Sequence, residues 1–167
     1  MVIGIFAAVG VNTSAAELID QMTLREKITQ MMMVDFRKWD EDPTDSTPSS
    51  NLTTVNPQVS QVVEDYKFGA VILFSNNIVD TEQTLNLTKD FQAAATKNGG
   101  IPLMIAADQE GGSVYRLATG TALPGNMALG ATYAANGTKY AKEAGKIIGS
   151  ELNALGINTS LTLNIKF

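Results

Sequence analysis

The sequence contains no cysteine and no histidine among its 167 residues. Without cysteine, the chain can form neither a disulfide framework nor a thiolate metal site. Without histidine, a zinc site would need carboxylates alone, and that ligand set is improbable for zinc. The sequence therefore predicts no bound metal.

Positive charge is also scarce, with 12 Lys and Arg against 17 Asp and Glu, a net charge of -5 and a pI near 4.6. Nucleic-acid binding calls for basic patches, and the few lysines here are scattered. We therefore expect neither a nucleic-acid partner nor attachment to an anionic membrane surface. The glycine patterns of dinucleotide sites and P-loops are absent as well, which leaves a Rossmann-like nucleotide binder as a distant alternative.

The apolar run over residues 2–11 is too short to span a bilayer, so no membrane span is expected there. Small residues suited to cleavage follow it at positions 12–16, as in a signal peptide, although a basic start is missing. We interpret residues 1–16 as a possible signal-peptide remnant, with a buried strand or helix start as the alternative. The expected location is extracellular or in the cell envelope, and the cytoplasm is the alternative.

The rest of the chain has the composition of one globular domain, 44% hydrophobic and 17% charged. Apolar spacing predicts helices and strands in strict alternation, and a capping box at Thr23 and Glu26 lies in the first helix. This order predicts an α/β fold with a parallel sheet, and four βα units are about half of a TIM-type (β/α)8 barrel. The expected helices are 17–30, 58–66, 81–97 and 133–155; the expected strands are 31–36, 69–74, 101–107 and 159–165; the expected loops include 37–57, on the ligand face of a barrel, and 118–130.

The chemistry of the chain is concentrated directly after the predicted strand 101–107. Asp108, Glu110, the pair Gly111 and Gly112, and then Arg116 follow it, at the strand end where α/β folds bind ligands. Paired carboxylates can perform glycoside hydrolysis, but two on one loop rarely flank a bond from opposite sides. We therefore interpret Asp108 as an acceptor for sugar hydroxyls.

The neighbours of Asp108 would support that role. Arg116 would offer a planar donor fork to the same ligand or hold a carboxylate in place. Gly111 and Gly112 would form a supporting loop, either through positive φ or by letting the backbone approach a ligand. The spacing alone favours a structural interpretation, in which Asp108 caps a turn and Glu110 pairs with Arg116.

Five segments in order resemble the N-terminal barrel domain of glycoside hydrolase family 3, in its β-N-acetylhexosaminidase branch. The most specific is Asp108-Gln109-Glu110-Gly111-Gly112 with Val114, Arg116 and Leu117. The others are residues 22–28, 69–74, 123–131 and 151–158, and the resemblance covers roughly residues 17–160. We therefore expect residues 17–167 to be a partial barrel domain of this family.

The resemblance implies hydrolysis of terminal β-linked N-acetylglucosamine, from peptidoglycan or chitin fragments, by a retaining mechanism without a cofactor. It places Asp108 and Arg116 against the sugar ring, and it implies a nucleophilic aspartate and an acid/base histidine. Neither has a counterpart here, because the family pattern is lost after Asn158, which suggests a reading frame broken or cut near Ser160. We expect this chain to be inactive alone, with no catalytic residue of its own.

Two further alternatives stay open for the function. The chain could be a non-catalytic fragment that binds sugar weakly or not at all, or part of a β-glucosidase of the same family. A half barrel also leaves sheet edges open, so self-association is a possible partner interaction beside the carbohydrate substrate.

Overall fold

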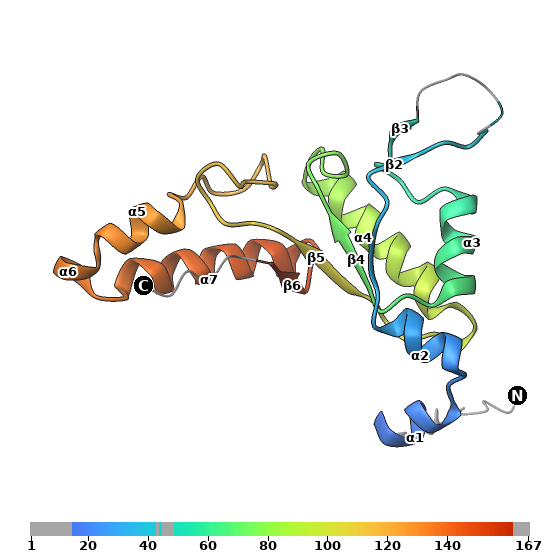
Figure 1. The fold of residues 1–167 in the computed structure, drawn as a ribbon. Coiled ribbons are helices and arrows are strands. Elements are labelled where there is room, and N and C mark those ends of the chain that lie inside the picture. Colours follow the sequence, from blue (N-terminus) through green and yellow to red (C-terminus); the bar gives the residue numbers. More distant parts are fainter. Residues whose placement is uncertain (1–14, 43, 45–48, 162–167) are drawn as a thin grey trace, which may run out of the picture.

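The structure is a computed structural model that describes residues 15–42, 44 and 49–161. It has helices, a parallel sheet and a two-residue antiparallel ladder (Figure 1). The elements are α1 Ala15–Gln21, α2 Leu24–Gln30, β1 Met33–Asp35, β2 Lys38–Trp39, β3 Ser50–Asn51, α3 Pro57–Tyr66, β4 Ala70–Leu73, α4 Thr81–Thr96, η1 Lys97–Gly99, β5 Met104–Ala107, α5 Asn126–Ala131, α6 Tyr133–Asn136, α7 Lys139–Ala154 and β6 Thr159–Ser160.

The main sheet confirms the predicted α/β architecture. Its order is β1-β4-β5-β6, every neighbouring pair is parallel, and the four strands follow one another in chain order. Neighbours in chain order, joined by helical crossovers, are the arrangement found in consecutive strands of a (β/α)8 barrel. All four strands therefore place their carboxyl ends at the same edge.

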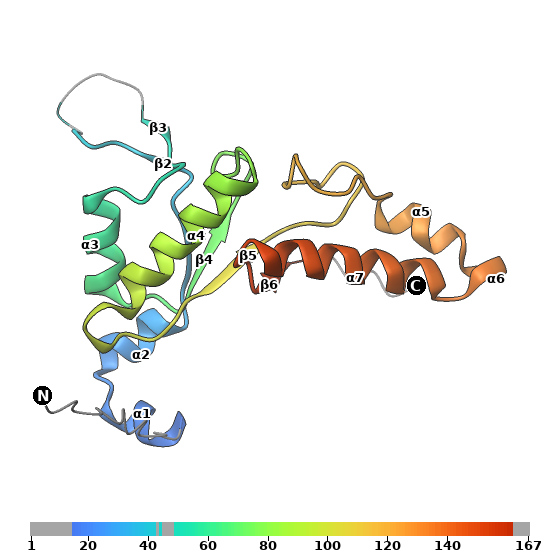
Figure 2. The same cartoon turned by 180° about the vertical axis from the view of Figure 1, so that it is seen from behind.

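One face of this sheet is covered by α3 and α4, which lie in front of it in Figure 2. Val71 and Leu73 of β4 and Ile105 of β5 are at most 1% exposed and belong to the same buried cluster as Phe91 of α4. Asn56 and Asp80 cap these two helices by accepting the N–H groups of Val59 and Gln83. The hydrophobic core of the described chain lies on this side.

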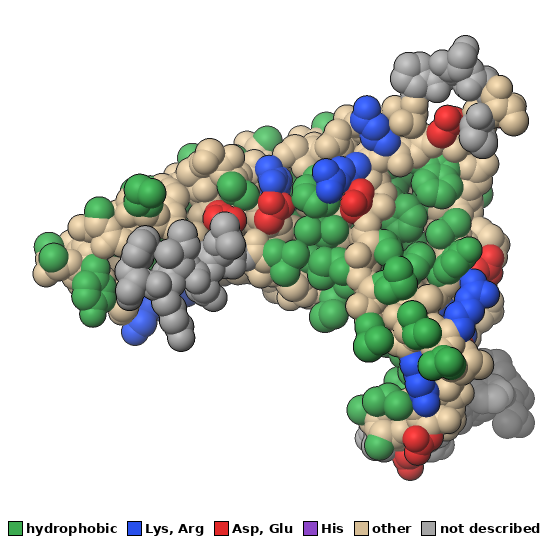
Figure 3. All heavy atoms as spheres, viewed as in Figure 1, with side chains coloured by type: hydrophobic (Ala, Val, Ile, Leu, Met, Phe, Trp, Pro, Cys, Tyr) green, Lys and Arg blue, Asp and Glu red, His purple; other side chains and the backbone are tan. Residues whose placement is uncertain are grey.

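The opposite face of the sheet is largely uncovered by the described residues. Alternation along the strands assigns Met33, Ile72 and Met104 to this face, and Met33 and Met104 remain 38% and 51% exposed. In Figure 3, apolar side chains spread over the sheet below a row of charged side chains. In a closed barrel this face would be the packed interior.

The predicted helix over residues 17–30 is wrong as a single helix, because the chain forms α1 and α2 with a break between them. Thr23 is the N-cap of α2, and both hydrogen bonds of the predicted capping box are present. The Thr23 hydroxyl accepts from the Glu26 N–H, while Glu26 accepts from the Thr23 N–H. The box therefore starts a new helix rather than strengthening a longer one.

The predicted helix over 133–155 is also divided, into α6 and α7. Gly137 has a φ of 56° between them, which an α-helix does not allow. The predicted loops are partly ordered as well, since α5 lies at the end of 118–130 and the β2–β3 ladder lies within 37–57.

The strands are shorter than predicted. Leu103 lies outside β5 because its N–H and C=O bind the side chain of Gln92, at 3.0 and 2.8 Å, instead of a neighbouring strand. Residues 31 and 32 still bond back to α2 through Ile28 and Thr29. Of the predicted strand 159–165, β6 forms the start, and residues 162–165 lie outside the described residues together with residues 1–14 of the predicted signal peptide. Within the described ranges, no helix is both long and apolar enough to cross a membrane.

Candidate functional site

The predicted site residues lie at the carboxyl edge of the sheet, in the loop that follows β5. Asp108 comes one residue after β5 ends, and the loop returns so that Arg116 lies beside it. Arg116 donates from Nε to Oδ1 of Asp108 at 2.9 Å and from Nη2 to Oδ2 at 2.5 Å. These two parallel hydrogen bonds fix the plane and direction of the Asp108 carboxylate.

The pair is partly shielded, since each side chain keeps 23% of its surface exposed. The hydrogen bond from Arg116 lowers the pKa of Asp108 below its ordinary value, against the opposing effect of burial. The same bond raises the pKa of Arg116. Asp108 is therefore an ionised acceptor with an exposed remainder, which suits it to receive hydrogen bonds from hydroxyl groups.

This pairing tests part of the structural interpretation of the loop. The expected ion pair between Glu110 and Arg116 is wrong, because Arg116 pairs with Asp108 instead. Arg116 does hold a carboxylate, as one interpretation of the sequence predicted. Whether Asp108 and Arg116 also contact a sugar stays a prediction.

The buried side chain of Gln109 holds the loop in place through hydrogen bonds to its backbone. The sequence alone assigned no role to this residue. Its side chain is 1% exposed, and Oε1 accepts the backbone N–H of Arg116 at 2.6 Å and that of Leu117 at 3.3 Å. Leu117 is itself buried in the core cluster. A buried amide and a buried apolar side chain therefore fix the backbone that presents Arg116.

The two glycines adopt positive φ, 79° at Gly111 and 60° at Gly112, which is one of the two roles that the sequence allowed for the pair. A Cβ on Gly111 would lie 2.7 Å from the backbone oxygen of Pro124. The N–H of Gly112 donates to the backbone oxygen of Leu123 at 2.8 Å. Glycine is required here both by conformation and by the close approach of the segment before α5.

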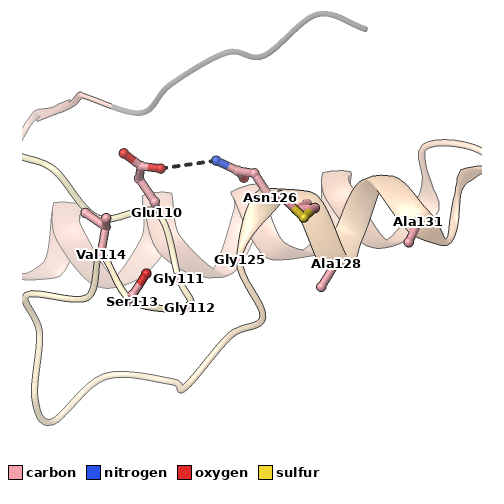
Figure 4. Close-up of a pocket in the computed structure, with 10 residues that line it drawn as sticks. Glu110, Gly111, Gly112, Ser113, Val114, Gly125, Asn126, Ala128 and Ala131 are labelled. Atoms are coloured by element: carbon pink, nitrogen blue, oxygen red, sulfur yellow. Dashed lines mark hydrogen bonds between the residues drawn. The ribbon is translucent and has the colours of Figure 1, made fainter.

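Glu110 lies towards α5 and takes no part in the ion pair between Asp108 and Arg116. It lines a pocket of about 580 Å³ between this loop and α5, and its Oε2 accepts from Nδ2 of Asn126 at 3.5 Å (Figure 4). The backbone N–H of Glu110 donates to the oxygen of Val114 at 2.9 Å, which closes the turn. Glu110 thus joins the loop to α5.

Phe74, just after β4, lies between two arginines at this edge. The guanidinium carbon of Arg37 is 3.7 Å from the centre of the Phe74 ring, and that of Arg116 is 5.9 Å away. Arg37 in turn pairs with Asp35, Nε to Oδ1 at 3.3 Å. Side chains alternate between the two faces of a strand, and continuing this alternation past the ends of β1 and β4 could have identified Arg37 and Phe74 as candidate site residues. The sequence gave no comparable signal for Gln109, because its role depends on how the loop folds.

The described part of the chain was also compared with the requirements of a metal site. Within the described residues, no three side chains of His, Cys, Asp or Glu come together closely enough to hold a metal ion. The chemistry that these residues offer is hydrogen bonding to a polar ligand at the carboxyl edge of the sheet.

Comparison with known proteins places this geometry in a family context. The family model described as the glycosyl hydrolase family 3 N terminal domain matches residues 23–163. The chain is 38% identical over 146 residues to β-hexosaminidase A of Pseudoalteromonas piscicida, covering 83% of this chain and 24% of that protein. It is 36% identical over 111 residues to β-hexosaminidase of Haemophilus ducreyi, covering 65% of this chain and 31% of the relative.

Solved structures of proteins from the same family are also similar to this chain. A glycoside hydrolase family 3 β-N-acetylglucosaminidase from Paenibacillus matches with a TM-score of 0.69 and 35% identity, over 84% of this chain and 24% of that one. NagZ from Neisseria gonorrhoeae, solved in complex with N-trifluoroacetyl-D-glucosamine, matches with a TM-score of 0.61 and 29% identity, over 78% and 35% of the two chains. The chain thus spans about a quarter to a third of the length of these relatives.

Proposed function

The chain belongs to glycosyl hydrolase family 3, and from that membership we propose that it supplies part of the sugar-binding site of a β-N-acetylhexosaminidase. The proposed ligand is a terminal β-linked N-acetylglucosamine, as found in peptidoglycan or chitin fragments. The names of the relatives support this choice over glucose, since those quoted above are β-hexosaminidases or β-N-acetylglucosaminidases.

The observation that carries the proposal is the bidentate pair of Asp108 and Arg116 at the carboxyl edge of the sheet. Arg116 occupies one side of the Asp108 carboxylate, and the exposed remainder of that carboxylate can accept two neighbouring sugar hydroxyls. Its lowered pKa keeps it ionised, and hydrogen bonds to an ionised acceptor are stronger than those to a neutral one.

For the complete enzyme we propose hydrolysis with retention, through a covalent glycosyl intermediate. This chain on its own is proposed to bind sugar without hydrolysing it. The sequence has no histidine to serve as acid and base, and Asp108 is engaged by Arg116 rather than poised as a nucleophile.

The proposal is tested by titrating the 167-residue chain with N-acetylglucosamine and with glucose, following affinity by NMR. We expect N-acetylglucosamine to bind more tightly than glucose, and Asp108→Asn to weaken it about tenfold or more, as for loss of a charged hydrogen-bond acceptor. Asp90→Asn is the matched control, because Asp90 is exposed on α4, on the helical side of the sheet.

Circular dichroism of each variant accompanies the titration, so that only folded variants are compared. Equal affinity of wild type and Asp108→Asn would contradict the proposal. A preference for glucose over N-acetylglucosamine would instead support the β-glucosidase alternative within the same family.

Self-association is proposed on a separate observation. Among the described residues, β1 pairs only with β4 and β6 only with β5, so each has an unpaired side, and the sheet face between them is partly apolar. Open strands of this kind pair readily with another chain. Sedimentation should show a dimer or larger species that a charge placed on the face, Met104→Lys, converts towards monomer. A monomeric wild type would contradict it.

Export is proposed from the N-terminal sequence alone. The apolar run over residues 2–11 and the small residues after it have the pattern of an export signal. Residues 1–16 joined to an alkaline phosphatase that is active only outside the cytoplasm should give phosphatase activity in cells. An inactive but intact fusion would contradict export through this segment.

A further inference from the structure

The segment around Arg116 is folded back on itself by two hydrogen bonds that meet at Gly120. The N–H of Gly120 donates to the backbone oxygen of Leu117 at 2.8 Å. The hydroxyl of Tyr115 donates to the backbone oxygen of Gly120 at 2.5 Å. Arg116 lies between Tyr115 and Leu117, so its backbone is tied to Gly120 from both sides. The place of Gly120 therefore affects how Arg116 is presented to Asp108.

The next residue, Thr121, is held by the half-buried side chain of Glu151 on α7. The two carboxylate oxygens of Glu151 accept the N–H of Thr121 at 3.0 and 3.1 Å, and Oε1 also accepts its hydroxyl at 2.5 Å. A Cβ on Gly120 would lie 2.8 Å from Oε2 of Glu151. Glycine at position 120 therefore leaves room for the carboxylate against the loop.

Glu151 is poorly placed for the helix that carries it. It lies in the last turn of α7, Glu151–Ala154, which contains no basic residue. The unpaired carbonyl groups of a helix C-terminus carry partial negative charge, so a carboxylate in the last turn opposes the helix dipole. Such a local conflict is typical of a residue whose role lies outside its own helix. The bonds to Thr121 identify that role as contact with the loop.

We propose that Glu151 is a positioning residue, which holds the loop so that Arg116 stays paired with Asp108 in the orientation that binds sugar. The inference rests on the proposed function of Asp108 and Arg116. Gln109 fixes the backbone of Arg116 from within the same loop. Glu151 acts from a different element, through Thr121, and thereby couples α7 to the candidate site.

The test replaces Glu151 with alanine in the full 167-residue chain. Alanine favours the helix and removes the charge that opposes its dipole, so weakening of α7 would not explain a change at the site. The pKa of Asp108 is held low mainly by its hydrogen bond from Arg116, with Arg37 as the more distant cation. Carboxyl NMR should therefore show the pKa of Asp108 rising towards its ordinary value, and the affinity for N-acetylglucosamine should fall about five- to tenfold.

Two further variants separate positioning from general effects. Glu151→Gln keeps a side-chain oxygen that can accept the N–H of Thr121, so both readouts should stay close to those of wild type. Glu143→Ala is the matched control, because Glu143 is exposed on the same helix, two turns earlier. It removes the same charge and should change neither the pKa of Asp108 nor the affinity.

The outcomes also separate this inference from the proposed function. A folded Glu151→Ala variant with the wild-type pKa at Asp108, or equal changes in Glu143→Ala, would overturn the positioning role. If Glu151→Ala does not fold, Thr121→Val decides by the same readouts, since it removes only the hydroxyl bond to Glu151. If wild type binds no N-acetylglucosamine while Glu151→Ala raises the pKa of Asp108, the sugar site fails and the positioning role stands.

Discussion

The side-chain oxygen of Gln109 accepts the backbone N–H of Arg116 at 2.6 Å, beneath the loop that follows β5. This bond fixes the backbone from which Arg116 reaches back to Asp108. The geometry of the candidate site therefore depends on a buried amide that is not itself in position to contact a ligand.

Replacing Gln109 with alanine should lower both stability and sugar affinity. The substitution leaves the N–H groups of Arg116 and Leu117 without their acceptor, at a cost of about 1–3 kcal/mol. Gln92→Ala is the matched control, because Gln92 also bonds backbone groups, those of Leu103, away from the loop. Urea unfolding and N-acetylglucosamine titration measure the two effects. Loss of affinity in Gln92→Ala as large as in Gln109→Ala would argue against a positioning role.

Gly111→Ala should destabilise the chain by more than about 1 kcal/mol, because the residue has positive φ and the new Cβ would meet the oxygen of Pro124. Gly145→Ala provides the opposite case. Gly145 lies within α7 with open space around a Cβ, so the change should stabilise by about 0.5–1 kcal/mol. Thermal melts of both variants measure whether each substitution lowers or raises the stability. A Gly111→Ala variant as stable as wild type would contradict the described loop.

Two adjacent residues of β5 test which face of the sheet is packed. Ile105 is 0% exposed on the helical side, so Ile105→Ala should cost about 2–5 kcal/mol. Met104 is 51% exposed on the other side of the single chain, so Met104→Ala should change the stability of the dissociated chain, at low protein concentration, by less than about 1 kcal/mol. Denaturant midpoints distinguish them, and equal losses would show that the second face is covered in solution.

Acid should weaken the start of α2 through Glu26. Hydrogen bonds from Lys67 and from Thr23 lower the pKa of Glu26 to about 2 from an ordinary 4.5. A carboxyl whose pKa is lower in the folded state stabilises the fold above its ordinary pKa and loses that effect as the pH falls. The stability difference between wild type and Glu26→Gln should therefore shrink between pH 4.5 and about pH 2. A difference that stays constant over this window would contradict the assigned contacts.

Strand positions and the parallel order could be predicted because buried strands are short apolar runs separated by helices. The boundaries could not, because tertiary contacts move them. The side chain of Gln92 binds the backbone of Leu103, so β5 begins only at Met104. The continuous apolar run of β4 predicts burial on both faces, yet Ile72 is only partly buried, since nothing in the described residues covers that side.

The candidate site was only partly readable from the sequence. Positive φ at Gly111 and Gly112 is one of the two roles that the sequence allowed for this pair. Pairing with a carboxylate is likewise one of the two roles that it allowed for Arg116. Which carboxylate it takes, Asp108 rather than Glu110, depends on how the loop folds back. Spacing along the chain does not contain that information.

The central claim is that the loop after β5 holds a sugar, and mapping N-acetylglucosamine onto the chain tests it most directly. Backbone amide shifts of the 167-residue protein would be followed during titration. The account predicts the largest changes at residues 108–116 and at Phe74, with α3 and α4 unaffected on their outer side. Changes confined to residues elsewhere, such as the groove lined by Ser60 and Asp90, or no changes at saturating sugar, would contradict it.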